Sequence, residues 1–124
     1  MIIDHCRNIK EFKDFYSAYP LPEEGDFGVS WCLNNPNLFC FYDEQTSELK
    51  AYIVISWEDN KNYLSGASCR KNFLDNIEGI IKVCNAFACD MYSYTKLKHA
   101  GLLLKKAGFK KISENEYLRI KNNE

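Results

Sequence analysis

The hydrophobic positions of the first third of the chain follow a helical repeat. They recur three and four residues apart, at Ile9, Phe12, Phe15, Tyr16 and Tyr19. Side chains at this spacing share one face, so the pattern predicts a helix between Asn8 and Pro20. Asn8 and Glu11 have the spacing of a capping box. A short strand over residues 2–6 is expected before this helix, and a short helix over residues 30–34 after it.

The middle of the chain is rich in β-branched and aromatic residues that lie between polar turns. Residues 38–42 and 49–57 are predicted strands, and the polar stretch 43–47 between them predicts an antiparallel hairpin. A polar turn over 58–62 then leads to a further strand over 63–68.

Helices and strands alternate in the second half. A helix is predicted over 71–87, since its apolar residues again have helical spacing. These residues are Phe73, Ile77, Ile80, Ile81, Cys84 and Phe87. A strand over 89–94 and a helix over 96–107 follow. The expected inward face of the last helix is Leu97, Ala100, Leu103, Leu104 and Ala107. Gly108 is placed to adopt a left-handed cap.

Residues 109–112 and 116–120 predict a closing hairpin, and residues 1–124 are predicted to form a single domain. The strands at 63–68 and 89–94 are joined by a helix, so we expect them to be parallel. The predicted fold class is α/β, with a mixed sheet of about six to seven strands and helices on both faces.

Charge is distributed unevenly along the chain. The formal net charge is -1, yet residues 1–60 carry 4 basic and 11 acidic side chains, whereas residues 61–124 carry 12 and 6. Solvated surface charge explains such a split. The alternative is a basic second half that faces a phosphate-bearing ligand or an acidic partner. The small net charge argues against nucleic acid as a partner.

The six cysteines lack the C-x-x-C spacing of metal sites, and no histidine stands at zinc-finger spacing. Most lie among apolar residues, so free and largely buried thiols are expected, which implies a reducing, cytoplasmic location. No metal is expected. Apolar runs are shorter than the ~20 residues of a membrane span, and the N-terminus lacks the pattern of a signal peptide, so no membrane partner is expected.

The segment TKLKHAGLLLKKAGF, from Thr95 to Phe109, carries a family signal. Ala100, Gly108 and Phe109 match the N-x-x-A-x-x-x-Y-x-x-x-G-F pattern found near the end of GNAT acyltransferases. The chain therefore resembles the GNAT family, and the order of its predicted elements does so over nearly the whole length. The resemblance implies a V-shaped mixed sheet and an acyl-CoA cofactor, either acetyl-CoA or another.

Two positions of that pattern depart from the family. The Asn that commonly contacts coenzyme A is Leu97 here, and the Tyr that often protonates the departing thiolate is Leu104. A leucine side chain has neither a donor nor an acceptor, so it can do neither task. The resemblance therefore leaves the catalytic residues unknown.

The family's Q/R-x-x-G-x-G/A loop, which cradles pyrophosphate at a helix N-terminus, aligns with residues 70–75. Arg70 matches, but Phe73 and Asp75 replace the small residues. Phe73 would crowd the backbone, and Asp75 would place a negative charge near the phosphates. Weak or altered cofactor binding is therefore implied. The corresponding cofactor-binding residues are Ala67, Ser68, Cys69, Arg70, Lys71 and Asn72.

Each candidate residue also has a structural interpretation. Arg70 and Lys71 can be solvated charges beside a turn, and Cys69 can be a core thiol. Glu58 and Asp59 stand near the place where some family members keep a general base, but they equally suit a polar turn.

The remaining candidates are two histidines, two tyrosines and a group of lysines. His5 and His99 are most simply surface or half-buried residues, and a catalytic histidine is the alternative. Tyr92 and Tyr94 alternate along a strand, where they line a cleft or pack the sheet. The lysines give the last helix a soluble surface or contact an anion: Lys96, Lys98, Lys105, Lys106, Lys110 and Lys111.

Two classes of function follow. The first is an acyl-CoA-dependent N-acyltransferase, in which a neutral amine of a small molecule or protein attacks the thioester directly. The second is a catalytically inactive GNAT-like protein that binds a host or partner protein. This small domain with a degenerate loop is similar to acyltransferase-like proteins of bacteriophages, which suggests a modulator or inhibitor of a host system.

Overall fold

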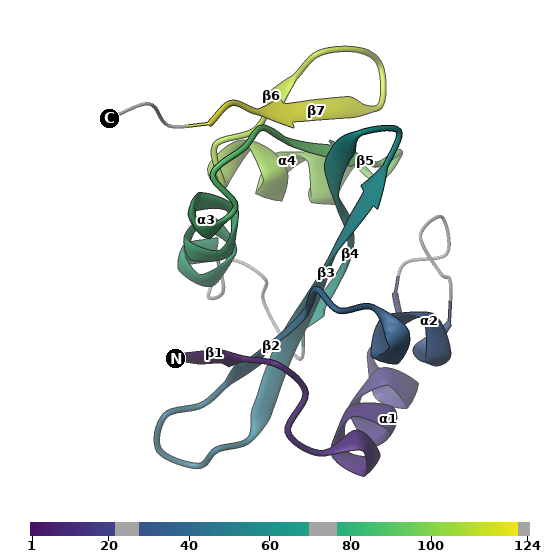
Figure 1. Cartoon of the computed structure of the whole chain (residues 1–124), viewed down its shortest axis with the longest axis vertical. Helices are drawn as coiled ribbons and strands as arrows, with labels where there is room; N and C mark the ends of the chain where they lie inside the picture. The colour runs from purple at the N-terminus through teal and green to yellow at the C-terminus, as the bar shows by residue number, and fades with distance from the viewer. Residues whose placement is uncertain (22–27, 70–76, 122–124) are drawn as a thin grey trace.

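The computed structural model describes residues 1–21, 28–69 and 77–121, with residues 66–69 described by their backbone alone. Each predicted helix and strand has a counterpart in this part of the chain (Figure 1). Their bounds are β1 Ile2–Asp4, α1 Ile9–Ala18, α2 Val29–Asn34, β2 Leu38–Tyr42, β3 Leu49–Glu58, β4 Lys61–Cys69, α3 Ile77–Ala86, β5 Met91–Tyr94, α4 Lys98–Lys106, β6 Lys110–Lys111 and β7 Glu116–Arg119. The start of the predicted third helix, including Phe73, lies outside the described residues.

The strands form one mixed sheet of seven strands in the order β1-β2-β3-β4-β5-β7-β6. As expected, β4 and β5 are parallel. The other neighbouring strands are antiparallel, and both predicted hairpins, β2–β3 and β6–β7, are confirmed. The molecule is therefore a mixed α/β structure in which β7 lies between β5 and β6.

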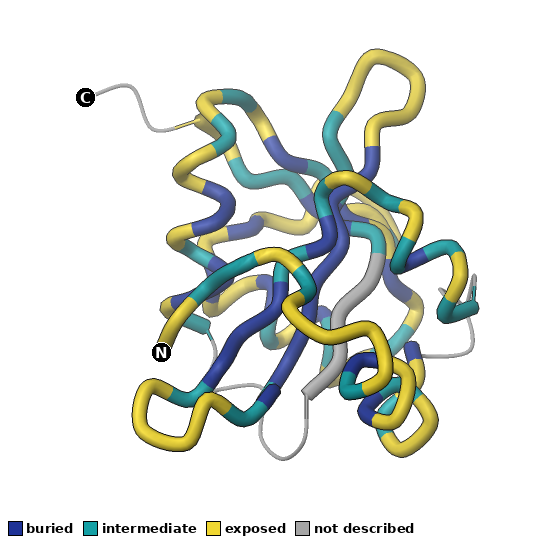
Figure 2. The backbone as a smooth tube through the Cα atoms, turned by 60° about the horizontal axis from the view of Figure 1, so that its bottom comes forward, coloured by how far each residue is buried: buried dark blue, intermediate teal, exposed yellow. Residues whose placement is uncertain are grey.

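Helices cover both faces of the sheet, with α1 and α2 on one face and α3 and α4 on the other (Figure 1). Alternate residues of a strand point to opposite faces. Tyr52 and Val54 of β3 therefore pack in the cluster of α1 and α2, while Ile53 and Ile55 pack in the cluster of α3 and α4. All four side chains are fully buried. Figure 2 shows this buried stretch running through the middle of the sheet.

The N-terminus of α1 is capped as expected, but only in part. The Asn8 side chain accepts a hydrogen bond from the Glu11 backbone N–H at 3.0 Å. The Glu11 carboxylate, which a capping box would direct back to Asn8, instead accepts from the Leu49 N–H at 3.3 Å and ties α1 to β3. Ile9 was expected on the buried face but is 60% exposed, because it opens the helix ahead of the turns that pack on β3.

Helix α4 ends in a Schellman motif. Gly108 has a φ of 96°, the left-handed conformation that glycine adopts without strain. The Phe109 N–H donates to the Leu104 carbonyl at 3.0 Å, and the Gly108 N–H donates to the Lys105 carbonyl at 3.1 Å. These two bonds satisfy carbonyls that the last turn of a helix leaves open. The predicted glycine cap is confirmed.

Arg119 of β7 joins the two helices of its face. Its Nε donates to the Ala107 carbonyl at the end of α4 at 3.1 Å. Its terminal nitrogen donates to the Asn85 side chain of α3 at 2.6 Å. The last strand is therefore fastened to both helices that cover it.

The turn between β3 and β4 is tighter than the sequence pattern indicated. Asp59 and Asn60 both have positive φ, 51° and 63°, and Glu58 pairs directly with Lys61. Two central residues with positive φ define a type I′ turn, which matches the twist of the flanking strands. The expected polar turn over 58–62 was too long, because polar residues here belong to the strands.

Replacing Gly101 with alanine is expected to destabilise the fold. A Cβ at this position would lie 2.2 Å from the Tyr117 hydroxyl oxygen. We expect Gly101→Ala to lower the free energy of unfolding by about 1–3 kcal/mol, despite the better helix propensity of alanine. Urea denaturation measures this. The double variant Gly101→Ala/Tyr117→Phe, which removes the hydroxyl, should recover most of the loss, and an unchanged single variant would contradict this packing.

The cysteines should differ in their reaction with N-ethylmaleimide. Cys32, Cys40 and Cys84 are buried free thiols. Burial raises the pKa of Cys40 to about 12 and that of Cys84 to about 11, so little thiolate forms near neutral pH. Cys6 and Cys89 are partly exposed.

Among the thiols that the structure describes, we therefore expect Cys89 to be labelled first at about pH 7.5, followed by Cys6, because partial burial also raises the pKa of Cys6. The three buried thiols should react at a comparable rate only in denaturant. Peptide mass mapping over time measures the order, and early labelling of Cys40 or Cys84 in the folded protein would refute it.

Candidate functional site

The parallel strands β4 and β5 separate after a short pairing. Asn62, Tyr63 and Leu64 pair with residues 91–93, whereas β4 continues to Cys69. Beyond Leu64, the described strands pair with β4 only on its β3 side. Because a strand directs its N–H and C=O groups to both sides, part of the backbone from Ser65 onward points toward the opening without a described strand partner. We call this opening the β4–β5 fork.

A bulge in β4 lies at the point where the fork begins. Val54 of β3 pairs with Gly66, but Ile55 pairs with Leu64, so Ser65 has no residue opposite it. A bulge bends its strand and increases its twist, and the pairing of β4 with β5 ends at the residue before it. The Ser65 hydroxyl contacts the hydroxyl of Ser56 on β3.

A side chain of β5 also marks the end of the pairing. The Ser93 hydroxyl, which is buried, donates a hydrogen bond to the Leu64 carbonyl at 2.9 Å. That carbonyl belongs to the last residue of β4 that pairs with β5. The bulge and this hydrogen bond together account for a parallel ladder only three residues long.

The other side of the fork is formed by the end of β5 and the start of α4. The Thr95 hydroxyl is buried and accepts a hydrogen bond from the Leu97 N–H at 3.0 Å. Leu97 is the N-cap residue of α4 and makes no side-chain capping bond. Leucine at this position therefore leaves the first N–H groups of α4 without the side-chain acceptor that Asn would supply.

The structure places half of the expected cofactor-binding residues. Ala67, Ser68 and Cys69 pair with residues 53, 52 and 51 of β3, so their backbone lies along the fork. Arg70, Lys71 and Asn72, together with Phe73 and Asp75 of the expected phosphate loop, lie outside the described residues. Of the expected site, the described residues therefore include the strand part, whose three residues are described by their backbone alone.

Tyr92 lies within a packed surface and Tyr94 is exposed. The rings of Tyr92 and Tyr63 are 5.7 Å apart, and the Lys61 ammonium lies 4.7 Å from the centre of the Tyr92 ring. These contacts support the sheet-packing interpretation of Tyr92. Tyr94, the last residue of β5, is 52% exposed and ends the strand on the fork side.

The other candidate residues lie elsewhere in the fold. Glu58 and Asp59 are exposed at the β3–β4 turn, before β4 begins. His5 stacks on Phe39 and its Nδ1 lies 3.4 Å from the Leu38 carbonyl oxygen. Glu58 and Asp59 therefore fit the polar-turn interpretation, and His5 has packing contacts of its own.

Leu104 stands where the GNAT resemblance implies a general acid. It is 8% exposed and belongs to the hydrophobic cluster of α3 and α4. The expectation that it faces inward is confirmed. Leu104 therefore packs against hydrophobic neighbours, and its side chain has no proton to donate.

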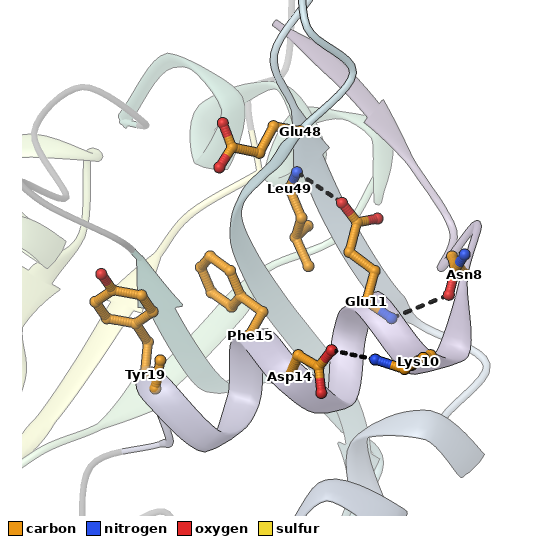
Figure 3. A pocket seen from close by; sticks show the side chains of 9 residues that line it. Asn8, Lys10, Glu11, Asp14, Phe15, Tyr19, Glu48 and Leu49 are labelled. Atoms are coloured by element: carbon orange, nitrogen blue, oxygen red, sulfur yellow. Dashed lines mark hydrogen bonds and ion pairs between the residues drawn. The ribbon is translucent and has the colours of Figure 1, made fainter.

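A hollow of about 450 Å³ lies beside α1 and the start of β3 (Figure 3). Its charged groups already have partners: Asp14 pairs with Lys10 at 2.9 Å, and Glu11 accepts from Leu49. A second hollow, of about 520 Å³, includes His5, Cys6 and residues of α2. No sequence pattern indicated either, because each brings together segments far apart in the chain.

Two features are absent from the described residues. No three His, Cys, Asp or Glu side chains there gather into a group that could hold a metal ion. None of the helices in the same ranges has the length and apolar character needed to cross a membrane.

Comparison with known protein families, curated proteins and solved structures finds no match to this chain.

Proposed function

We propose that this protein is an acyl-CoA-binding N-acyltransferase of GNAT type with weak or altered cofactor binding. The observation that carries the proposal is the β4–β5 fork. An acyl-CoA has an amide-bearing arm that can pair with an open strand edge, as an added strand does. The residues from Ser65 to Cys69 offer such an edge. The order of elements and the match at Ala100, Gly108 and Phe109 add support.

Recognition of acyl-CoA by the backbone of β4 would also give the fork a chemical role. A bound acyl-CoA would supply an activated thioester. Backbone N–H groups of β4 that point into the fork would hold and polarise its carbonyl oxygen. The acyl group would pass directly to a neutral amine, with the coenzyme A thiolate as the leaving group. The proton lost by nitrogen would reach the thiolate through solvent, because Leu104 provides no acid.

Calorimetric titration with acetyl-CoA tests the proposal. We expect a micromolar Kd and, with a panel of amines, an acetylated product detectable by mass spectrometry. Arg70→Ala should weaken binding about tenfold if the arginine contacts a phosphate. Lys10→Ala removes a positive charge from the exposed side of α1 and should leave binding unchanged. Absence of heat with about 1 mM acetyl-CoA would exclude the acyl-CoA function.

A second candidate function is binding to a protein without catalysis. It is favoured by Leu97 and Leu104, which stand where the family has a cofactor contact and an acid. In that case the fork is an inherited feature of the fold, and the functional surface lies elsewhere.

A tyrosine at position 104, where the GNAT pattern has one, should not act as a general acid. We expect Leu104→Tyr to lower the free energy of unfolding by about 1–3 kcal/mol, since it overpacks a buried cluster and buries a hydroxyl. It should also add no transferase activity. The matched control is Leu102→Tyr on the exposed side of the same helix, with an expected change within about 0.5 kcal/mol. Equal stability of the two variants, with a gain of activity at 104, would show that position 104 opens to the fork.

A further inference from the structure

The outer face of α4 presents an apolar side chain surrounded by positive charge. Leu102 is 53% exposed. Residues three and four positions away are its neighbours on the helix surface. They are Lys98, His99, Lys105 and Lys106, and all four are exposed. We call these five residues the α4 outer face.

Charge on this face is of one sign. Residues 96–111 contain six lysines and no carboxylate. The ion pairs found among the described residues include none of Lys98, Lys105 and Lys106. Strand β6, which packs next to α4, adds the exposed Lys110 and Lys111.

Helix stability explains only part of this arrangement. Lys105 and Lys106 lie in the last turn, where the helix dipole favours cations. Lys98 lies in the first turn, where the same dipole disfavours a cation. Helix stability also does not account for the exposed apolar side chain of Leu102 in the middle of these cations. A binding role accounts for both features.

The α4 outer face is held rigidly by the opposite side of the helix. Gly101 and Leu104 are buried, and Gly101 lies against the Tyr117 hydroxyl of β7. Arg119 fixes the C-terminal end of α4 through the Ala107 carbonyl. A partner would therefore meet a preformed surface, with little ordering needed on this side.

We propose that the α4 outer face binds an acidic segment of a protein that carries an apolar side chain to cover Leu102. An apolar centre inside a charged rim is the usual arrangement of a protein interface. A phosphate backbone would leave Leu102 uncovered, and one leucine is too little apolar surface to anchor a helix in a lipid interface. The proposal does not depend on the acyl-CoA function, because none of these residues lies in β4.

Titration of ¹⁵N-labelled protein with a synthetic peptide tests the proposal. The probe is an acidic helical peptide with glutamates around a central leucine, and its control has serine in place of that leucine. We expect shifts of the amide resonances over residues 98–106, with binding that weakens as salt rises. The serine peptide should bind about fivefold more weakly or worse.

Matched variants distinguish binding at the α4 outer face from general electrostatic attraction between the peptide and the protein. Leu102→Ser and Lys105→Glu should each lower the affinity for the leucine peptide about fivefold or more. Lys13→Glu, an equal change of charge on the exposed side of α1, should alter the affinity less than twofold. Circular dichroism should show that all three surface variants are folded.

Several outcomes would overturn the proposal. One is the absence of resonance shifts over residues 98–106 at about 1 mM peptide. Another is equal binding of the leucine and serine peptides, which would show that the α4 outer face attracts acidic peptides by charge alone. Tighter binding of a single-stranded oligonucleotide or of anionic phospholipid vesicles, with unchanged affinity in Leu102→Ser, would assign the face to a polyanion or a membrane.

Discussion

Strand β3 is buried on both faces, and the rest of the fold is arranged around it. From Leu49 to Ile55 every side chain except Lys50 is at most 1% exposed. A strand in that position needs a hydrophobic layer on each side and a strand along each edge. Helices α1 and α2 supply one layer, α3 and α4 the other, and β2 and β4 pair with the edges.

This burial also determines where the sheet can open. Strand β4 must remain paired with β3 along its whole length, because a gap there would expose the core. Its other edge is less constrained, and its pairing with β5 ends at the residue before the bulge at Ser65. The fork is thus compatible with a stable core, and a ligand in it would meet backbone groups of β4. A site of this kind leaves little trace in side-chain motifs, so the losses at Leu97 and Leu104 bear on catalysis more than on the strand edge.

The sequence pattern was sufficient to predict the order of the elements and the β2–β3 hairpin. It also predicted the parallel pairing of β4 with β5 and the glycine cap at Gly108. It could not predict the bulge at Ser65 or the hydrogen bond from Ser93 to Leu64, because register depends on two strands at once. The exposed Leu102 was also missed as a surface feature, although the inward residues of α4 were identified. Leucines at 102, 103 and 104 follow one another, and only packing decides which of them meets solvent.

The position of β7 between β5 and β6 has a consequence for the route of folding. Strands β1 to β4 pair with their neighbours in the sheet, and three of these four strands follow one another closely in the chain. Strand β5 acquires its second neighbour only when β7 arrives, after α4 and β6. The β2–β3 and β3–β4 hairpins therefore close short loops, whereas β1 must reach β2 across residues 5–37 and β5 must reach β7 across residues 95–115, at a greater entropic cost. Strand β5 therefore keeps one edge unpaired until the last strand of the chain arrives, and in this half of the sheet it is the strand most open to pairing with another chain at that stage.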